Sequence, residues 1–233
     1  MSYYNQGNQI QKTTPVVLNL LIINVLVFAA QNIITEFNIT QWGSLYYYKS
    51  PLFKPHQFIT SMFLHLNFMH IAFNMFGLWM FGTILERFWG PKKFLIFYLI
   101  CGIGGGIFEQ LLTPYDAMQM AKHMPEYISG QYSLSEISEA LKMNNYSLGA
   151  SGAIMGVFAA FAYLFPNTAL YIMFIPIPIK AKYVIPFFVL IDLFGGIYRI
   201  QGDNIGHFAH LGGALIGFLL VLFWNKTNRK TFY

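Results

Sequence analysis

The chain has 233 residues, of which 56% are hydrophobic and only 10% are charged, and its mean hydropathy is +0.49. A soluble domain carries about 25% charged residues, so this composition predicts a membrane protein. The net charge of +5 does not indicate nucleic-acid binding, because the basic residues are divided between short loops and the two ends of the chain. Cys101 is the single cysteine, which excludes an intrachain disulfide and a cysteine metal cluster.

Six apolar segments, each about as long as a helix that crosses a bilayer, predict an all-α membrane protein with a six-transmembrane-helix bundle. We expect the membrane domain at 15–225, between a disordered cytoplasmic N-terminus at 1–14 and a cytoplasmic tail at 226–233. The polar segment 113–147 is expected to form an extended extracytoplasmic loop. The predicted spans are residues 15–34, 59–85, 94–112, 149–165, 183–198 and 205–224.

Two local signals mark where helices begin. Asn67 lies within the second apolar segment as an N-cap residue, so the regular helix is expected to start there. Ser133 and Glu136 have the spacing of a capping box, which predicts a short helix through Lys142 inside the polar segment.

The basic residues predict the orientation in the membrane. With six spans and the N-terminus inside, nine basic residues fall inside and five outside, which favours cytoplasmic termini. The inside set is Lys12, Arg87, Lys92, Lys93, Lys180, Lys182, Lys226, Arg229 and Lys230. The outside set is Lys49, Lys54, Lys122, Lys142 and Arg199.

A possible nucleophile opens the fourth span. Gly149 can take backbone angles closed to other residues, so a loop can enter the helix sharply there. Ser151 then falls in the first turn, where free N–H groups and the helix dipole favour negative charge. These surroundings suit a hydroxyl that attacks a carbonyl beside a developing oxyanion. Helix packing alone also explains the motif, because Gly152 and Gly156 form a small-xxx-small ridge.

Three spans bring polar side chains to one depth. Spans two, four and six all run from outside to inside, and Ser151, His210, His70 and Asn74 lie near their outer ends. Polar residues in a membrane are costly and usually face an interior cavity, so this convergence predicts a site. His210 would serve as general base and then as acid to the leaving amine. His70 and Asn74 share a helix face, and with the Ser151 N–H they would stabilise an oxyanion.

Glycines support the same geometry. Gly213 and Gly217 lie on the sixth span, four residues apart and below the histidine. They are suited to packing against Gly152 and Gly156, and close helix contact is what a direct Ser–His hydrogen bond needs.

The motif Gly149-Ala150-Ser151-Gly152, followed by Ala209-His210-Leu211-Gly212-Gly213, resembles the rhomboid family of intramembrane serine proteases. The run His65-x4-His70-x3-Asn74 fits the second-helix motif of that family. The resemblance implies a Ser151–His210 dyad without a third carboxylate, and an oxyanion hole from His70, Asn74 and the Ser151 backbone. It also implies transmembrane-segment substrates cut near the outer face at small residues, and a water cavity gated by the fifth helix and a cap loop.

Three features depart from the family pattern. Many members carry Trp-Arg in the first loop, where this chain has His56-Gln57. An aromatic residue often follows the serine by one turn, and here Met155 takes its place. The 113–147 segment is longer than in a minimal rhomboid, and its role is open.

Several polar residues have explanations other than catalysis. Asp192 is interpreted as a structural or gating residue without a nameable partner. His65 is assigned a structural hydrogen-bonding role, and His207 either lines the water cavity or is a spectator. Glu86, with Arg87, is expected to anchor the inner interface by hydrogen bonds. The four histidines 65, 70, 207 and 210 lack a carboxylate at ligand spacing, so we expect no metal and no cofactor.

An intramembrane serine endopeptidase is therefore the favoured function, with transmembrane substrates and membrane lipid as partners and no nucleic acid. The expected location is a bacterial inner membrane. One alternative is a non-catalytic rhomboid-like protein that binds transmembrane segments. Another is a small-solute transporter or channel, although no inverted repeat is visible.

Overall fold

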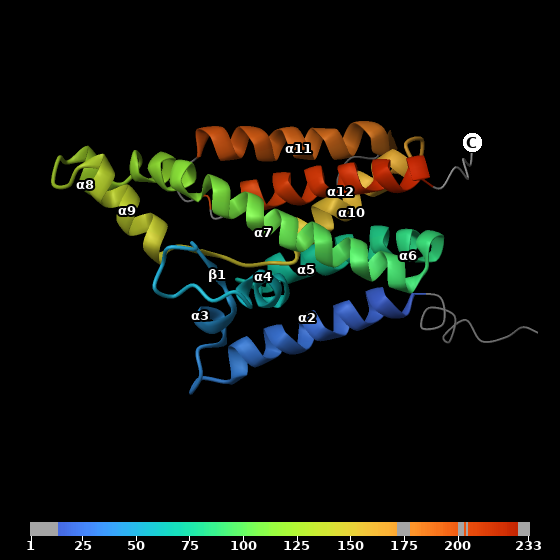
Figure 1. Cartoon of the computed structure of the whole chain (residues 1–233), viewed down its shortest axis with the longest axis horizontal. Coiled ribbons are helices and arrows are strands. Elements are labelled where there is room, and N and C mark those ends of the chain that lie inside the picture. Colours follow the sequence, from blue (N-terminus) through green and yellow to red (C-terminus); the bar gives the residue numbers. More distant parts are fainter. Residues whose placement is uncertain (1–13, 172–177, 200–202, 204, 228–233) are drawn as a thin grey trace, which may run out of the picture.

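The computed structural model describes residues 14–171, 178–199, 203 and 205–227. Apart from α9, its long helices lie side by side in one bundle, and α8 and α9 project from one end (Figure 1). The expected disordered terminus, apart from Thr14, and most of the expected tail lie outside the described residues. The long helices are α2 (Pro15–Ile33), α5 (Phe68–Gly77), α6 (Thr83–Trp89), α7 (Pro91–Ala121), α9 (Leu134–Asn144), α10 (Ser151–Leu164), α11 (Ala181–Tyr198) and α12 (His207–Thr227). The short helices are α3 (Ile39–Gly43), α4 (Gln57–Thr60), η1 (Ser61–Phe63), η2 (Leu78–Gly82) and α8 (Pro125–Ile128).

Five helical stretches among the described residues are long and apolar enough to cross a bilayer. They are α2, the continuous stretch from α5 to α6, α7, α11 and α12. The expected fourth span is α10, which has only 14 residues. The chain is thus a multi-pass integral membrane protein whose α10 is shorter than its neighbours.

A buried carboxylate holds the start of α2. Pro15 occupies the first turn of this helix, where a missing N–H costs nothing. The next two N–H groups, of Val16 and Val17, donate to the two carboxylate oxygens of Glu86 at 2.9 and 2.8 Å. Glu86 is fully buried, so it anchors the first helix to α6 as the sequence predicts.

The second span begins later than the expected residue 59. Residues 57–63 form the short helices α4 and η1, and α5 starts after Asn67, whose side chain accepts a hydrogen bond from the His70 N–H at 2.9 Å. The predicted N-cap is confirmed. The helix then passes through the π-helical turn η2, for which the sequence carries no signal.

The third span is longer than predicted. Helix α7 has 31 residues and continues through Pro114 to Ala121, so it occupies the first part of the segment expected to be a loop. The loss of apolar residues after 112 does not end the helix. The predicted capping box at Ser133 and Glu136 is confirmed, and it opens α9, which packs back against α7.

Short strands and a buried glutamine fix the loop before α4. Strand β1 (Leu45–Tyr46) pairs antiparallel with β2 (Tyr146–Ser147), and β3 (Ala169–Leu170) pairs with β4 (Ile179–Lys180). Gln57 is 1% exposed, accepts from the Lys54 N–H at 3.1 Å and donates to the Leu52 carbonyl at 3.0 Å. This glutamine therefore anchors the loop at the place where many rhomboids carry Trp-Arg.

Candidate active site

Ser151 is the first residue of α10, and the turn before it needs glycine. Gly149 has a φ of +130°, and its N–H donates to the Ser61 carbonyl at 2.8 Å. A Cβ at Gly149 would lie 2.8 Å from Nε2 of His70, so a side chain there would collide with that ring. The glycine therefore lets the chain turn sharply into α10 and leaves room for the imidazole beside Ser151.

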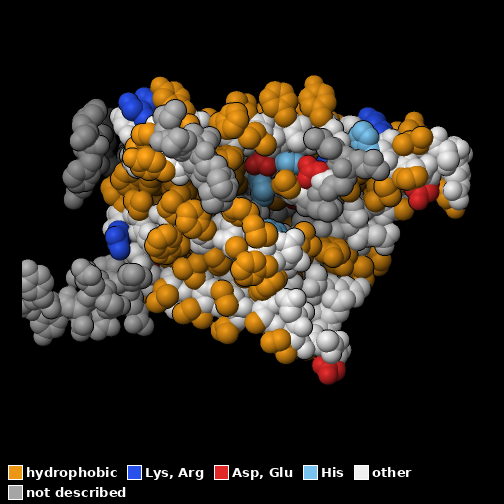
Figure 2. All heavy atoms as spheres, turned by 180° about the vertical axis from the view of Figure 1, so that it is seen from behind, with side chains coloured by type: hydrophobic (Ala, Val, Ile, Leu, Met, Phe, Trp, Pro, Cys, Tyr) orange, Lys and Arg blue, Asp and Glu red, His pale blue; other side chains and the backbone are white. Residues whose placement is uncertain are grey.

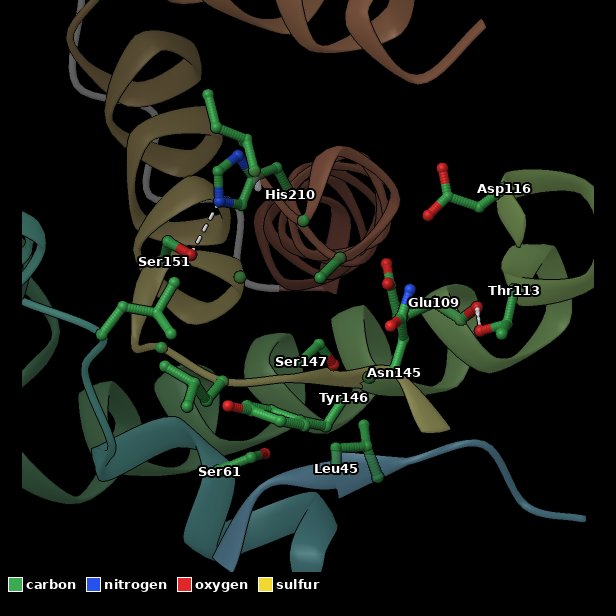
Figure 3. A pocket seen from close by; sticks show the side chains of 18 of the residues that line it. Leu45, Ser61, Glu109, Thr113, Asp116, Asn145, Tyr146, Ser147, Ser151 and His210 are labelled. Atoms are coloured by element: carbon green, nitrogen blue, oxygen red, sulfur yellow. Dashed lines mark hydrogen bonds between the residues drawn. The ribbon is translucent and has the colours of Figure 1, made fainter. Parts of the chain in front are cut away.

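His210 lies in the first turn of α12 and faces the start of α10. Its Nε2 is 2.7 Å from Oγ of Ser151, the geometry of a direct hydrogen bond between a hydroxyl and an imidazole (Figure 3). Two residues that are 59 positions apart in the chain thus meet as the sequence predicts.

Four glycines make this meeting possible. A Cβ at Gly217 would lie 2.5 Å from Cα of Gly156, and a Cβ at Gly156 would lie 2.9 Å from the Gly213 carbonyl oxygen. A Cβ at Gly213 would overlap the carbonyl of Gly152. Helices α10 and α12 therefore pack backbone against backbone, and we call this contact the glycine seam.

His70 and Asn74 come from α5 and line the same cavity as Ser151 and His210. Asn74 is 7% exposed, and its Nδ2 has no hydrogen-bond partner among the described residues. Buried donors without partners are rare and costly, so this one suggests an acceptor that binds during function. The structure brings together all four side chains that the sequence predicts for the site.

The cavity is large and its walls are mixed in character. Its volume is about 960 Å³, and residues of α5, α7, α10 and α12 contribute to its lining. Histidine and acidic side chains are visible in a hollow of an otherwise largely hydrophobic face (Figure 2). The arrangement gives a chamber inside the bundle that has both apolar walls and polar side chains.

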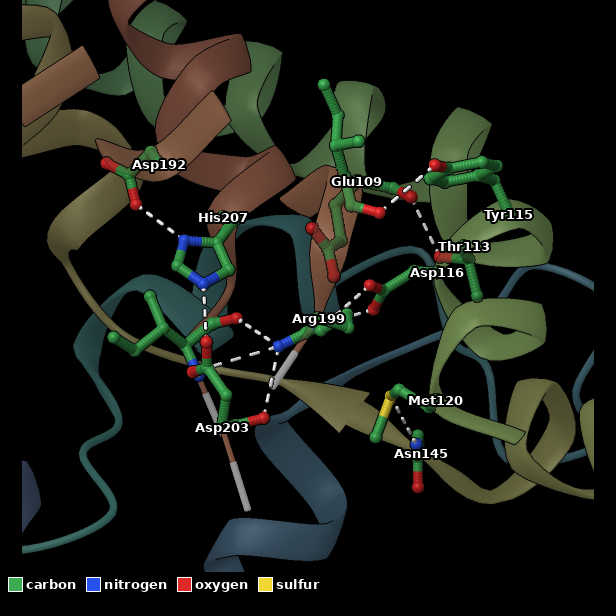
Figure 4. A network of polar contacts seen from close by, with 12 residues as sticks. Glu109, Thr113, Tyr115, Asp116, Met120, Asn145, Asp192, Arg199, Asp203 and His207 are labelled. Carbon is green, nitrogen blue, oxygen red and sulfur yellow. Dashed lines mark hydrogen bonds and ion pairs between the residues drawn. The ribbon is translucent and has the colours of Figure 1, made fainter. Parts of the chain in front are cut away.

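A network of charged side chains extends from the site (Figure 4). Oδ1 of Asp192 lies 3.0 Å from Nδ1 of His210 and 2.8 Å from Nδ1 of His207. Nε2 of His207 lies 2.7 Å from Oδ2 of Asp203. Arg199 donates to both carboxylate oxygens of Asp116 at 2.6 and 2.7 Å. The network connects α7, α11, α12 and the segment between the last two.

Arg199 and Asp203, which lie between α11 and α12, have shifted pKa values. Burial alone would lower the pKa of Arg199, but the hydrogen bonds and charge of Asp116 raise it above its ordinary value. Burial alone would raise the pKa of Asp203, but the hydrogen bonds from His207 and the Ile205 N–H lower it. Both groups are therefore held in their charged forms.

The structure changes the interpretation of three polar residues, Asp192, His207 and His65. Asp192 has a definite partner, since its carboxylate bonds to His210, where the resemblance implies no third carboxylate. His207 is 3% exposed, so it does not line the cavity. It bonds to two carboxylates, so it is also not a residue without polar contacts. The His65 backbone bonds to Gln31, while its ring packs edge-on against that of His70.

One sequence signal could have found the role of Asp192. It lies six residues before the C-terminal end of α11, and His210 lies three residues after the start of α12, so the two residues are at similar depths in successive helices. An acid at the depth of a predicted catalytic histidine is a candidate partner for it.

Comparison with known proteins decides the family. A family model described as the Rhomboid domain matches residues 53–226. The chain belongs to the rhomboid family. Rhomboids are in general intramembrane serine proteases that act on transmembrane substrates, although some members are inactive.

This rhomboid is similar to three curated relatives that are named as mitochondrial. It is 31% identical to RHOMBOID-like protein 12, mitochondrial, of Arabidopsis thaliana over 93% of this chain and 60% of the relative. It is 29% identical to Rhomboid protein 1, mitochondrial, of Saccharomyces cerevisiae over 65% of this chain and 37% of the relative. It is 27% identical to the Presenilin-associated rhomboid-like protein, mitochondrial, of Rattus norvegicus over 64% of this chain and 32% of the relative.

The chain thus spans between about a third and 60% of the length of these relatives. Their names give no support to the expected bacterial inner membrane.

Proposed function

We propose that this rhomboid is an intramembrane serine endopeptidase in which Ser151 is the nucleophile and His210 is the general base and acid. The observation that carries the proposal is the 2.7 Å contact between Nε2 of His210 and Oγ of Ser151 at the start of α10. A serine hydroxyl is a weak nucleophile unless a neighbouring base removes its proton. His210 is within reach to do so.

The reaction follows from this pair. Oγ of Ser151 attacks the scissile carbonyl carbon while its proton passes to Nε2 of His210. The tetrahedral intermediate collapses when His210 returns that proton to the leaving amine, which leaves an ester on Ser151. A water molecule in the cavity then gives a proton to Nε2 of His210 and attacks the ester. The second tetrahedral intermediate collapses when His210 returns this proton to Oγ of Ser151, and the second product leaves with a free carboxyl group.

Three donors are available for the oxyanion of the intermediate. The N–H of Ser151 lies in the first turn of α10, where it has no helical partner. Nδ2 of Asn74 is buried without a partner, and the His70 ring lies against the turn at Gly149. Donors that are fixed before the reaction stabilise a developing charge without reorganisation, which is worth about 3–4 kcal/mol for a single donor.

The substrates of this site are transmembrane segments, and cleavage takes place near the outer membrane face. The basic residues support this orientation, because Arg87, Lys92 and Lys93 lie at the end of the bundle opposite Ser151. The proposal includes six spans, counting the short α10, with both termini inside. A bacterial inner membrane and an organellar membrane are both compatible with this topology.

The test is cleavage of a reporter transmembrane substrate in liposomes, together with labelling by a fluorophosphonate probe. We expect Ser151→Ala to lose both activities, and His210→Ala to lose cleavage and at least about 100-fold in labelling rate. Ser147→Ala is the matched control, because Ser147 lines the same cavity but lies on β2, where it pairs with Leu45 of β1.

Two outcomes would contradict the proposal. Cleavage that survives in Ser151→Ala would show that another residue is the nucleophile. A folded wild-type protein that binds a transmembrane peptide but neither labels nor cuts would instead favour the non-catalytic binding protein.

A further inference from the structure

Helix α11 contains one acidic residue, and this residue points at the proposed catalytic histidine. Asp192 is 8% exposed in a helix that is otherwise almost entirely apolar. Its Oδ1 faces Nδ1 of His207 at 2.8 Å and Nδ1 of His210 at 3.0 Å. An acid at this depth is costly unless its charge is used, so its partners indicate its role.

The protons on His207 follow from its two neighbours. Its Nδ1 faces Asp192, and its Nε2 faces Oδ2 of Asp203 at 2.7 Å. An ionised carboxylate accepts hydrogen bonds and cannot donate them, so both ring nitrogens of His207 must carry a proton. His207 is therefore an imidazolium cation between two carboxylates, and its charge lowers the cost of burying Asp192.

The protons on His210 follow in the same way. Its Nδ1 faces the carboxylate of Asp192, so Nδ1 carries the proton and donates it. Its Nε2 then has a free lone pair, which faces the hydroxyl of Ser151 at 2.7 Å. This is the one neutral tautomer that can accept the serine proton.

We propose that Asp192 is a positioning residue of this proteolytic site, which holds the neutral His210 ring in the orientation and tautomer that a general base needs. The inference rests on the proposed function. Asp192 acts through His210 and does not contact the substrate. After proton transfer, the same carboxylate lies beside the new imidazolium and stabilises it.

Other charged groups also surround His210. Glu109 on α7 and His70 on α5 are near enough to interact electrostatically with the His210 ring. Asp203 and Arg199 lie beyond His207. Among these groups, Asp192 alone forms a hydrogen bond with the ring at Nδ1, the nitrogen that faces away from Ser151.

The first test is kinetic and uses Asp192→Asn in the full chain. Asparagine keeps the size of the side chain, but its amide can donate to Nδ1 and trap the wrong tautomer. We expect kcat for the reporter substrate to fall on the order of 100-fold, with KM within about threefold of wild type. Asp192→Glu restores the charge, and we expect it to recover part of kcat although it fits the space less well.

Asp203→Asn is the matched control, because Asp203 bonds to His207 and has no bond to His210. If Asp192 served only to anchor His207, the two Asn variants would lose activity equally. We expect Asp203→Asn to lose clearly less kcat. Equal losses, or a kcat for Asp192→Asn within about threefold of wild type, would overturn the inference.

The second test needs no variant of Asp192. In wild-type protein with ¹⁵N-labelled histidine, we expect the neutral His210 ring to show a protonated Nδ1 and an unprotonated Nε2. The signal is assigned by its loss in His210→Ala. The opposite tautomer would overturn the inference even if Asp192→Asn failed to fold.

The inference and the proposed function fail in different ways. Cleavage that survives in Ser151→Ala removes both. Cleavage that is lost in Ser151→Ala but unchanged in Asp192→Asn removes only the role of Asp192.

Discussion

Adding one methyl group to the glycine seam tests whether backbone contact sets the Ser–His distance. The Cβ of Gly217→Ala would lie 2.5 Å from Cα of Gly156. Nonbonded carbon atoms pack at about 3.5–4.0 Å, so α10 and α12 must separate locally by about 1 Å. The helices have no side chains in the seam that could rotate away and absorb this shift.

The separation affects both stability and activity. Passed on to the site, it would lengthen the 2.7 Å contact between His210 and Ser151 to about 3.7 Å, which is beyond hydrogen-bond range. A misplacement of about 1 Å costs on the order of 100-fold in rate. Overpacking itself costs about 1–3 kcal/mol of folding free energy. We therefore expect Gly217→Ala to lower the fluorophosphonate labelling rate strongly and the melting temperature moderately.

The assay is the labelling rate in detergent, with thermal unfolding measured on the same samples. Gly206→Ala is the control, because its Cβ would meet only Cβ of Ala209, at an ordinary 3.7 Å. Gly213→Ala should lose more than Gly217→Ala, because its methyl would overlap the Gly152 carbonyl closer to the site. If Gly217→Ala labels as fast as Gly206→Ala, the seam does not set the Ser–His distance.

Three further changes test other contacts. Asn74→Leu removes a buried donor that has no partner among the described residues, so we expect no fall in melting temperature. We expect kcat to fall by about 10²–10³-fold, because a donor to the oxyanion is lost. A fall in melting temperature that parallels the fall in kcat would refute the oxyanion role. Glu86→Gln weakens the charged hydrogen bonds at the start of α2 and should cost about 1.5–3 kcal/mol in thermal unfolding, whereas the exposed Arg87→Gln should change little. Asp116→Asn removes the nearer of the two carboxylates beside the buried Arg199 guanidinium and leaves Asp203 at 3.9 Å, so it should cost up to about 3–5 kcal/mol. An unchanged melting temperature would contradict the importance of this pair.

Features that depend on neighbouring residues could be predicted from the sequence. The N-cap at Asn67 and the capping box at Ser133 involve residues no more than three positions away, so a short window contains all of their chemistry. The contact between Ser151 and His210 could be predicted for another reason. Both lie at the first turns of helices that are predicted to run in the same direction, so the sequence predicts a similar depth for them.

Features that depend on which helix faces which could not be predicted. Hydropathy shows where the apolar part of α7 ends, but the continuation of the helix to Ala121 depends on packing against α9 and on the pair between Asp116 and Arg199. Depth alone places Asp192 level with His210, but it does not say which way either side chain points. The π-helical turn Leu78–Gly82 has no local signal, because a run of Leu, Trp, Met, Phe and Gly is also found in regular membrane helices.

The short α10 has a consequence for the membrane itself. Its 14 residues span about 21 Å, whereas the hydrocarbon core of a bilayer is about 30 Å thick. Ser151 at the start of α10 lines the cavity, which can hold water for hydrolysis. Below Ser151, the buried side chains of Ile154, Val157 and Phe161 close the path. A protein of this design admits water to part of the depth of the bilayer and keeps the rest as a barrier, so liposomes that contain it should hold a proton gradient.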